Sequence, residues 1–449
     1  MLNWLYLTLN RYSSSSAARL ARSARLAPGW LVRRVAAAKL VRTLRHVWRN
    51  SPHQRERWRE AGIRLRHLRS PRVLERVPFL EPDELTQHPE RFFCVPKSDF
   101  THIMSTSGTG GRPRRVWFTT DDIDHQAHVL GATLRRLPGA SCVLVLMAAI
   151  EPTWGPGDMA MRGVEKAGMR GFQVPRGESP QKHIEHIREF RPDVLISTPT
   201  WTHRLTLEAD VQVKTLGIKY ILLSSQPMPR MLRGKLEAAW GATVIDAYAT
   251  NECACGIAAE CEHGDGLHVA EADFWIEIVD PETGRTLDEG DEGEIVITTL
   301  SRRGMPLVRY RIGDLSRFLP EDKPCACGLP LRKIAPIKGR VDHVLIIGSG
   351  FNVYPDEFDR AILAVPGVTD YQLTVEKEGY KDRFHVTVET AESVDGLSDR
   401  LREALLGIKY IHLNAQERSH VVFGEFKSVA PGTLSAGRRK TVRIVDKRV

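Results

Sequence analysis

The sequence has no long hydrophobic run. Among its 449 residues there is no stretch of eighteen apolar residues, so we expect no transmembrane helix. The apolar patch at the start, MLNWLYLTL, precedes the first arginines, whereas the apolar region of a secretory signal peptide follows its basic residues. These two absences predict a cytoplasmic protein.

Acidic residues are scarce at the N-terminus. Residues 1–72 contain 17 lysines and arginines but only two acids, Glu56 and Glu60, whereas the net charge of the whole chain is +9. The rest of the chain is therefore net acidic. We predict a basic, amphipathic extension over residues 1–45, in which Trp4, Leu5, Tyr6, Leu7 and Leu9 accompany the arginines.

Three explanations of this extension stay open. A basic and apolar segment suits peripheral contact with an anionic membrane. It also suits a solvated Arg-rich helix pair, or a segment that packs on the rest of the protein or on a partner. We expect no nucleic-acid partner.

The cysteines do not form a set of pairs. There are seven, an odd number, and without a signal peptide this argues against a disulfide framework. Five of them fall in two clusters, which indicates metal binding instead: Cys253, Cys255, Cys261, Cys325 and Cys327.

The apolar pattern predicts an α/β chain with a large, multi-sheet N-terminal domain and a small α+β C-terminal domain. From residue 141 to 300, short apolar runs such as SCVLVLMAA and YILLSS alternate with helix-like stretches, which is typical of a largely parallel sheet. Residues 272–320 read as antiparallel strands, and residues 31–75 read as helix. We place the large domain at residues 46–340 and the small, mobile domain at residues 343–449.

A glycine-rich segment at residues 105–113, STSGTGGRP, is the sharpest local motif. Glycine lets backbone N–H groups converge on an anion, and hydroxyl groups add donors. No Gly-Lys-Ser/Thr follows, so the segment is not a Walker A loop. On composition alone, a phosphate loop and an ordinary hairpin are equally good interpretations. The candidate phosphate ligands are Ser105, Thr106, Ser107, Gly108, Thr109, Gly110 and Gly111.

Five motifs in order resemble those of the adenylate-forming superfamily, which includes acyl-CoA synthetases, peptide-synthetase adenylation domains and luciferases. The phosphate loop is the first. The others are DAYATNE at 246–252, RYRIGDL at 309–315, GRVDHVLIIGSGFNVYPDEFD at 339–359 and GRRKTVRIVDKR at 437–448. VLERVPFLEPDEL, GLHVAEADFWIEIVD and CACG are most similar to the phenylacetate–CoA ligase branch.

The resemblance implies ATP-dependent activation of a carboxylic acid as an acyl-AMP, followed by transfer of the acyl group to a thiol. It implies a nucleotide site in which Tyr248 stacks near the adenine and Asp314 and Arg340 bind the ribose. Glu252 would hold Mg²⁺, which prefers one or two carboxylates plus phosphate oxygens. Lys440 would be the catalytic lysine, a cation that reaches the α-phosphate and the carboxylate.

The chain departs from the family pattern at four positions. Ala249 replaces a common glycine, and Gln226 stands where glutamate is frequent. Asn251 replaces a Thr or Ser hydroxyl at the α-phosphate, where an amide can still donate. Arg439 replaces the glycine before Lys440, so Arg439 and Lys447 are alternative candidates for the catalytic cation.

Two further assignments follow from the resemblance. Asp342 resembles the hinge residue about which the small C-terminal domain, the lid of this fold, rotates between adenylation and thioester formation. Together with His268, three of the cysteines form a set that suits a tetrahedral structural zinc, as in several phenylacetate–CoA ligase-like proteins. This set is Cys261, His268, Cys325 and Cys327, with Cys253, Cys255 and His263 as competing ligands and free thiols as the alternative.

The sequence does not identify the acid. Trp154, Met159 and Met161 are candidates either for an apolar acyl pocket or for plain core, and Glu151 for a substrate amine. The first hypothesis is an aryl- or acyl-CoA ligase using ATP, Mg²⁺ and CoA. The second is an adenylating enzyme that loads the phosphopantetheine thiol of a carrier protein or forms an amide. The third is a non-catalytic binding protein on the same fold.

Overall fold

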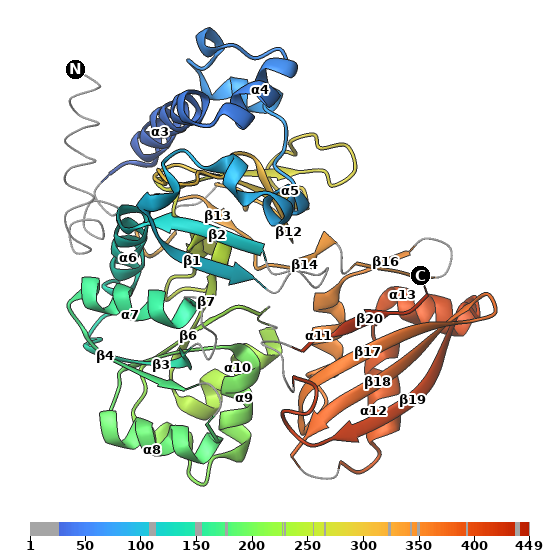
Figure 1. Ribbon diagram of the computed structural model, residues 1–449. Helices are drawn as coiled ribbons and strands as arrows, with labels where there is room; N and C mark the ends of the chain where they lie inside the picture. The colour runs from blue at the N-terminus through green and yellow to red at the C-terminus, as the bar shows by residue number, and fades with distance from the viewer. Residues whose placement is uncertain are drawn as a thin grey trace.

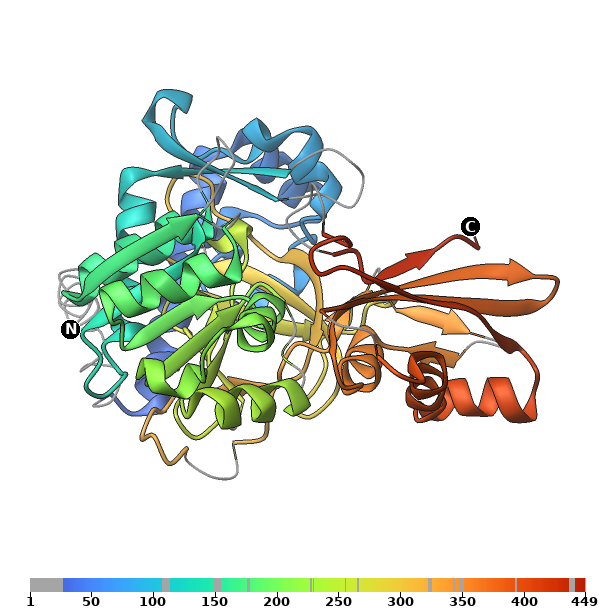
Figure 2. The ribbon, with the colours of Figure 1, turned by 90° about the horizontal axis from the view of Figure 1, so that it is seen from below.

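The chain folds into a large N-terminal domain and a small C-terminal domain (Figure 1), which confirms the predicted fold class. The structure is a computed structural model, and it describes residues 27–448 except 107–113, 149–154, 176–177, 227, 229, 255, 265, 322–324, 342–343, 348–350, 392–393 and 436–440. No helix in these described ranges is both long and apolar enough to cross a membrane. Figure 2 shows the small domain projecting from one side of the large one.

The centre of the large domain is an eight-stranded sheet with the order β13-β9-β8-β7-β6-β5-β3-β4. The strands from β4 to β7 are parallel, as predicted, and the remaining three add in antiparallel fashion. The bounds are β3 Cys142–Ala148, β4 Arg170–Pro175, β5 Val194–Ser197, β6 Tyr220–Ser224, β7 Thr243–Tyr248, β8 Ala258–Ala259, β9 Leu267–Val269 and β13 Lys333–Ile334.

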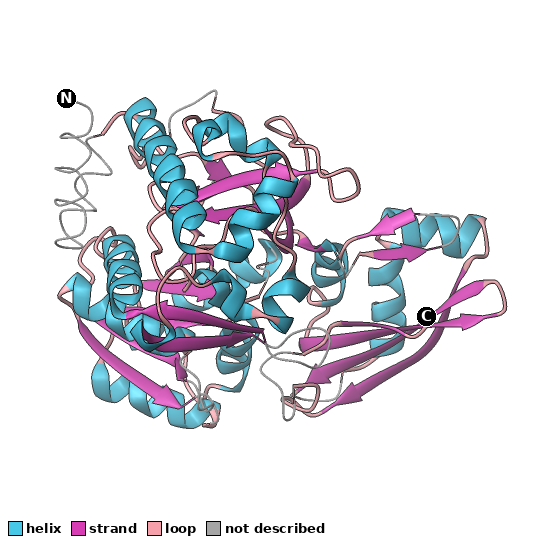
Figure 3. Cartoon of the chain, turned by 45° about the horizontal axis from the view of Figure 1, so that its top comes forward, coloured by secondary structure: helices cyan, strands magenta, loops and turns pink. Residues whose placement is uncertain are grey.

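Helices cover both faces of this sheet because its strands are apolar on both faces. In β3, Val143 and Val145 pack with α6 and α7, whereas Leu144 and Leu146 pack with α8, α9 and α10 on the other face. Figure 3 shows these helices flanking the strands. Their bounds are α6 Thr120–Leu134, α7 Pro156–Ala167, α8 Pro180–Phe190, α9 Pro199–Glu208 and α10 Arg230–Trp240.

Two antiparallel units complete the large domain. A four-stranded sheet has the order β10-β11-β12-β14, and a separate hairpin joins β1 and β2. The bounds are β1 Phe100–Thr106, β2 Arg114–Thr119, β10 Phe274–Val279, β11 Gly293–Thr299, β12 Tyr310–Ser316 and β14 Gly339–Arg340.

The helical prediction for residues 31–75 is only partly right. α3 spans Gly29–Asn50 and α4 spans Pro52–Glu60, but beyond α4 there are only 3-10 turns at Leu65–His67 and Pro71–Arg76. Prolines at 52 and 71 fit only in the first turn of a helix, so they divide the segment. After these turns, α5 follows at Pro82–Gln87.

α3 runs through the boundary placed at residue 45. Its face with Leu40, Leu44 and Val47 is buried against Leu300 and Val308 of the large domain. The part of the extension from residue 29 onward is therefore a packing element. Trp4, Leu5, Tyr6, Leu7 and Leu9 lie outside the described residues.

The small domain has its own core around the sheet β19-β18-β17-β20. β17 and β18 form a long antiparallel pair, against which β19 and β20 add in parallel. The bounds are β15 Leu345–Ile347, β16 Phe351–Val353, α11 Pro355–Ile362, β17 Val368–Glu378, β18 Lys381–Thr390, α12 Leu397–Leu406, α13 Lys409–His412, β19 Val421–Val429 and β20 Ile444–Asp446.

Candidate active site

The carboxyl ends of β5, β6 and β7 meet at one edge of the large sheet. Ligands of open parallel sheets bind at this edge, because the strand-to-helix loops converge there. Tyr248 is the last residue of β7, and Gln226 follows β6 by two residues. Oε1 of Gln226 accepts hydrogen bonds from the backbone N (3.2 Å) and Oγ1 (2.8 Å) of Thr200, so this side chain fixes the start of α9.

Tyr248, Asp314 and Arg340 form a hydrogen-bonded group that joins the two sheets of the large domain. The hydroxyl of Tyr248 donates to Oδ2 of Asp314 at 2.6 Å, and NH1 of Arg340 donates to Oδ1 at 3.2 Å. Asp314 and Arg340 are partners in the register of β12 and β14. Burial, and then the charge of Asp314, raise the pKa of Tyr248 well above its ordinary value, so this hydroxyl stays a donor.

Close approach at this group depends on a glycine. Gly313 has φ +81°, and a Cβ there would lie 2.6 Å from NH2 of Arg340. Any side chain at 313 would displace the guanidinium and strain the backbone. The glycine of RYRIGDL is thus required by the position of Arg340.

Glu252 lies in a short 3-10 turn, Asn251–Cys253, in which Oγ1 of Thr250 accepts a bond from the backbone N of Cys253. Its side chain is buried, and Oε1 accepts hydrogen bonds from NH1 of Arg114 at 2.6 Å and from the hydroxyl of Tyr310 at 3.3 Å. NH2 of Arg302 donates to its backbone carbonyl at 2.6 Å. The turn is therefore held from three sides.

The glycine-rich segment that we predict as a phosphate loop lies in the sequence between β1 and β2. The strands pair up to Thr106 and Arg114, and the loop residues Ser107, Gly108, Thr109, Gly110 and Gly111 lie outside the described residues. Nδ2 of Asn251 donates to the backbone carbonyl of Ser105 at 2.6 Å. The start of the loop is thus tied to Asn251, and the residue that follows it, Arg114, is tied to Glu252.

Sequence reasoning missed Arg114, Tyr310 and Arg302. Tyr310 stands inside the RYRIGDL motif, and Arg114 directly follows the loop. Their positions in or beside motifs could have marked both as candidate site residues. Arg302 had none, because its contact with the turn arises only when the loop after β11 folds back on it.

The candidates for the catalytic lysine and for the hinge lie mostly outside the described residues. Lys440, Arg439 and Asp342 lie outside the described residues. The alternative Lys447 forms an ion pair with Glu376 on the surface of the small domain, with Nζ 2.9 Å from Oε1.

Four potential metal ligands come together from the loop between β8 and β9, from β9 itself and from the loop before β13. Their ligand atoms all lie within 4.8 Å of one another, and the group is Cys261, His268, Cys325 and Cys327. Sγ of Cys261 lies 3.6 Å from Sγ of Cys325, and Sγ of Cys327 lies 3.4 Å from Nε2 of His268. Tetrahedral zinc with Zn–S bonds of about 2.3 Å places ligand atoms roughly 3.8 Å apart, so these residues fit a zinc ion.

The orientation of His268 also suits a metal. Nδ1 lies 3.2 Å from the carbonyl oxygen of Leu331, to which it donates, and this leaves the Nε2 lone pair directed at the sulfurs. Burial lowers the pKa of His268 to about 4, so the ring is neutral at pH 7.

The competing ligands lie elsewhere. Cys253 is buried in the main core, and burial raises the pKa of its thiol to about 12. His263 is exposed and does not belong to the cluster, and Cys255 lies outside the described residues.

The residues considered for an acyl pocket have mixed positions. Met159 is fully buried in the main core, and Met161 packs beside β4 at Gly171. Trp154 and Glu151 lie outside the described residues. Met159 therefore has a packing role.

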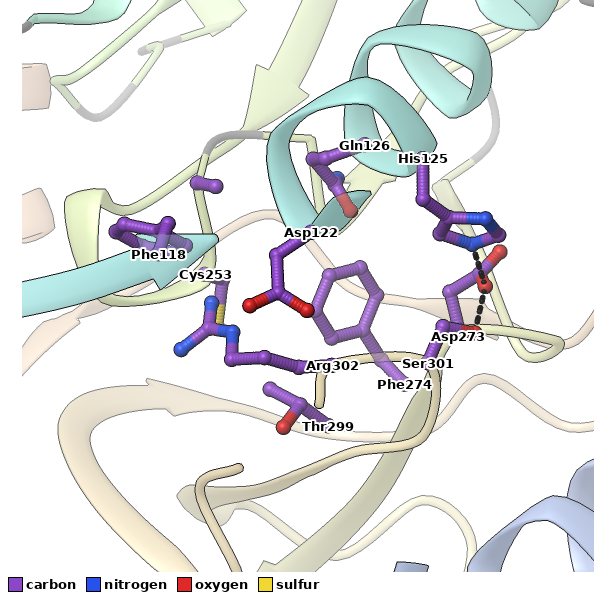
Figure 4. A pocket seen from close by; sticks show the side chains of 11 residues that line it. Phe118, Asp122, His125, Gln126, Cys253, Asp273, Phe274, Thr299, Ser301 and Arg302 are labelled. Atoms are coloured by element: carbon purple, nitrogen blue, oxygen red, sulfur yellow. Dashed lines mark hydrogen bonds and ion pairs between the residues drawn. The ribbon is translucent and has the colours of Figure 1, made fainter. Parts of the chain in front are cut away.

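A cavity beside the active site has a different lining. Figure 4 shows Asp122, Gln126, Cys253 and Arg302 around it, with Asp273 bonded to His125 and Ser301 at one end. None of Tyr248, Glu252 or Asp314 lines it. The cavity is thus distinct from the group of motifs at the sheet edge.

Comparisons with known proteins point to one family. The AMP-binding enzyme family matches residues 31–301, and the AMP-binding enzyme C-terminal domain matches residues 350–448. The chain is similar to phenylacetate-coenzyme A ligase of Pseudomonas putida, with 30% identity over 91% of this chain and 92% of that protein. The ligase of the same name from Thermus thermophilus is 33% identical over 82% of this chain and 84% of that protein.

Solved structures agree on the fold. A 2-hydroxyisobutyryl-CoA ligase in its postadenylation state has a TM-score of 0.78, with 23% identity over 92% of this chain and 89% of that chain.

Proposed function

This chain belongs to the AMP-binding enzyme family and is an ATP-dependent, AMP-forming acid–thiol ligase, and we propose that the group of motifs at the carboxyl edge of the large sheet is its active site. One observation carries this assignment. Residues from four separate motifs are joined there by direct hydrogen bonds, Tyr248 and Arg340 to Asp314, and Asn251 to Ser105.

In this proposal, residues of the chain hold ATP and the acid in position and neutralise the charge of the phosphates. The phosphate loop binds the phosphates of ATP. Asp314 accepts hydrogen bonds from the ribose hydroxyls, and Arg340 donates to the ribose. Mg²⁺ at Glu252 would neutralise phosphate charge. Holding the acid in line with the α-phosphate removes most of the entropic barrier to the reaction.

Two steps follow. A carboxylate oxygen of the acid bonds to the α-phosphorus while the bond to the β-phosphate oxygen breaks, which yields acyl-AMP and pyrophosphate. A thiolate sulfur then bonds to the acyl carbon, and AMP leaves with the bonding electrons of the C–O bond. We assign Lys440 to the first step, where its cation would stabilise the developing charge, and Asp342 to the hinge between the steps.

We propose CoA as the thiol and an aryl or small apolar acid as the substrate. The support is the similarity to phenylacetate-coenzyme A ligases over most of both chains. The departures at Ala249 and Asn251 do not favour a non-catalytic protein, because Asn251 braces the phosphate loop through Ser105.

The test is product analysis by mass spectrometry with ATP and a panel of acids. Each acid is offered CoA, a phosphopantetheinylated carrier protein or an amine as the acceptor. We expect an acyl-CoA from phenylacetate or a related acid. Thioester on a phosphopantetheinylated carrier protein alone, or an amide alone, would contradict the choice of CoA.

We also propose that the cluster of Cys261, His268, Cys325 and Cys327 holds a structural zinc. Support comes from the spacing of the four ligand atoms and from the neutral His268 ring. Zinc there would link two segments about sixty residues apart and stabilise the folded state.

Peripheral membrane contact through residues 1–45 stays a proposal that rests on sequence. The arginines would add on the order of 1 kcal/mol each at an anionic surface. Full-length protein that remains in solution with anionic vesicles at low salt would contradict it.

A further inference from the structure

Two side chains of the large domain reach the backbone of the small domain. Nε2 of His203, on α9, lies 3.2 Å from the carbonyl oxygen of Val368, and His203 is 5% exposed. Nζ of Lys235, on α10, donates to the carbonyl oxygen of Leu363 at 3.3 Å. Leu363 directly follows α11 and Val368 is the first residue of β17, so both acceptors lie where the chain passes from α11 to β17, on the side that faces α9 and α10 in Figure 1.

A third contact brings a turn of the small domain onto α9. Gly432 has φ +85°, and a Cβ at this position would lie 3.0 Å from NH1 of Arg204. The Arg204 side chain is itself held by an ion pair with Glu208, Nε to Oε1 2.7 Å. The residues around Gly432 therefore rest against a fixed side chain of the large domain.

The same part of the small domain anchors both flanks of the segment GRRK at 437–440, here called the lysine motif. Before the motif, Glu389 accepts hydrogen bonds from the backbone N of Gly432 at 2.8 Å and of Leu434 at 2.7 Å. After it, Oγ1 of Thr441 donates to Oδ2 of Asp370 at 2.6 Å. Asp370 and Glu389 are cross-strand partners in β17 and β18.

These contacts form a continuous connection from α9 to the lysine motif. Val368, which bonds to His203, is two residues from Asp370 in β17. α9 in turn begins at the carboxyl edge of the large sheet, where Thr200 bonds to Gln226. The docking of β17 on α9 thus sets the distance between the flanks of the motif and the edge that we assign to ATP.

We propose that His203 and Lys235 are positioning residues for acid adenylation, which hold the small domain in the orientation that presents the lysine motif to ATP. The proposal rests on the function proposed above. In the proposed function the small domain rotates for thioester formation, and this rotation would separate the two side chains from their carbonyl partners. Their contribution is therefore confined to the first half-reaction.

The test compares the two half-reactions in His203→Phe and Lys235→Met. Phenylalanine keeps an aromatic ring in the buried position but has no N–H, and methionine keeps the apolar stem of lysine. Adenylation is followed as acid-dependent ATP–pyrophosphate exchange, and the second step as thioester formation from supplied acyl-AMP and CoA. We expect exchange to fall about fivefold in each variant, the effect of losing one hydrogen bond, while thioester formation from acyl-AMP stays at the wild-type rate.

Two controls separate positioning from general damage. His203→Gln and Lys235→Arg retain donors and should recover most of the exchange rate. Lys214→Met removes an exposed lysine of the large domain and should leave both half-reactions unchanged.

Three outcomes overturn the proposal: unchanged exchange in both variants, equal losses in the two half-reactions, or no recovery with the donor-retaining variants. If the wild-type protein itself catalyses neither half-reaction with any acid, the proposed function fails instead.

Discussion

NH1 of Arg114 lies 2.6 Å from Oε1 of Glu252, and the side chains of this ion pair are 12% and 7% exposed. The guanidinium is also fixed on its other side, because its Nε donates to the carbonyl oxygen of Pro82 and to Oγ1 of Thr86 in α5, each at 3.3 Å. Tyr310 donates to the same oxygen of Glu252, so the protein ligands of this carboxylate gather on Oε1. Because the described partners of this carboxylate bind Oε1, we propose that Oε2 would bind Mg²⁺.

Arg114→Met should destabilise the protein strongly, because a buried carboxylate loses its counter-charge. We expect the free energy of unfolding to fall by about 3 kcal/mol in metal-free buffer, measured by urea denaturation.

Glu252→Gln keeps a hydrogen-bond acceptor for Arg114 and should be less destabilising, yet it should reduce pyrophosphate exchange by about 100-fold. Full exchange activity in Glu252→Gln would contradict a metal-binding role for Glu252.

Asp314→Asn should weaken ATP binding. The substitution removes the negative charge that faces Tyr248 and Arg340, and the amide can accept fewer hydrogen bonds from ribose hydroxyls. The KM for ATP should rise about tenfold, whereas the KM for CoA should change little. Steady-state kinetics at saturating acid measure both constants, and an unchanged KM for ATP would show that the ribose binds elsewhere.

Purified protein should contain about one zinc per chain. Elemental analysis after preparation under reducing conditions tests this directly. Cys327→Ser should reduce the zinc content, and strong chelation should lower the melting temperature of wild-type protein, because the ion stabilises the fold. Protein that is folded, active and zinc-free would contradict the assignment.

Asp273 should be the main electrostatic anchor of α3 to the body. Its carboxylate contacts Lys39 of α3 at 3.5 Å, His125 of α6 at 2.7 Å and Ser301 at 2.6 Å. Burial opposes its charge, but Lys39 and His125, together with these hydrogen bonds, hold its pKa well below the ordinary value. Asp273→Asn should lower the free energy of unfolding by about 3 kcal/mol at pH 7.

The pH dependence of that difference has a definite sign. A carboxyl group whose pKa is depressed by folding stabilises the protein above its unfolded pKa of about 4, and this stabilisation is lost as pH falls. The gap between wild type and Asp273→Asn should therefore shrink as the pH falls below about 4. Urea denaturation at several pH values measures it, and a gap that stays the same or widens below about pH 4 would contradict the assignment.

The sequence predicted the parts of the fold in which the spacing of apolar residues matches the burial of the element. The strands of the large sheet around Val143, Leu195 and Leu222 are apolar on both faces, so continuous apolar runs identified them. β19 was not predicted, because it lies at the edge of its sheet and its buried and exposed residues alternate only weakly. The 3-10 turns after Glu60 have a helix-like composition, and only the second turn, Pro71–Arg76, contains a proline that indicates a break.

For the site, motifs indicated residue roles but not partners. Tyr248 and Asp314 were each assigned to the nucleotide, yet their direct hydrogen bond depends on how two sheets meet. Arg114 and Arg302 reach the Glu252 turn from positions far away in sequence. Such long-range contacts leave no periodic pattern in the sequence, which is why only the structure shows them.

Acid-dependent ATP–pyrophosphate exchange, measured without any thiol, tests the central claim most directly. Only an enzyme that forms acyl-AMP reversibly returns labelled pyrophosphate to ATP in an acid-dependent manner. We expect exchange with phenylacetate or a related acid, an absolute requirement for Mg²⁺, and a loss of at least about 100-fold in Lys440→Ala. Exchange that is absent with every acid of a broad panel, while ATP still binds, would contradict the account.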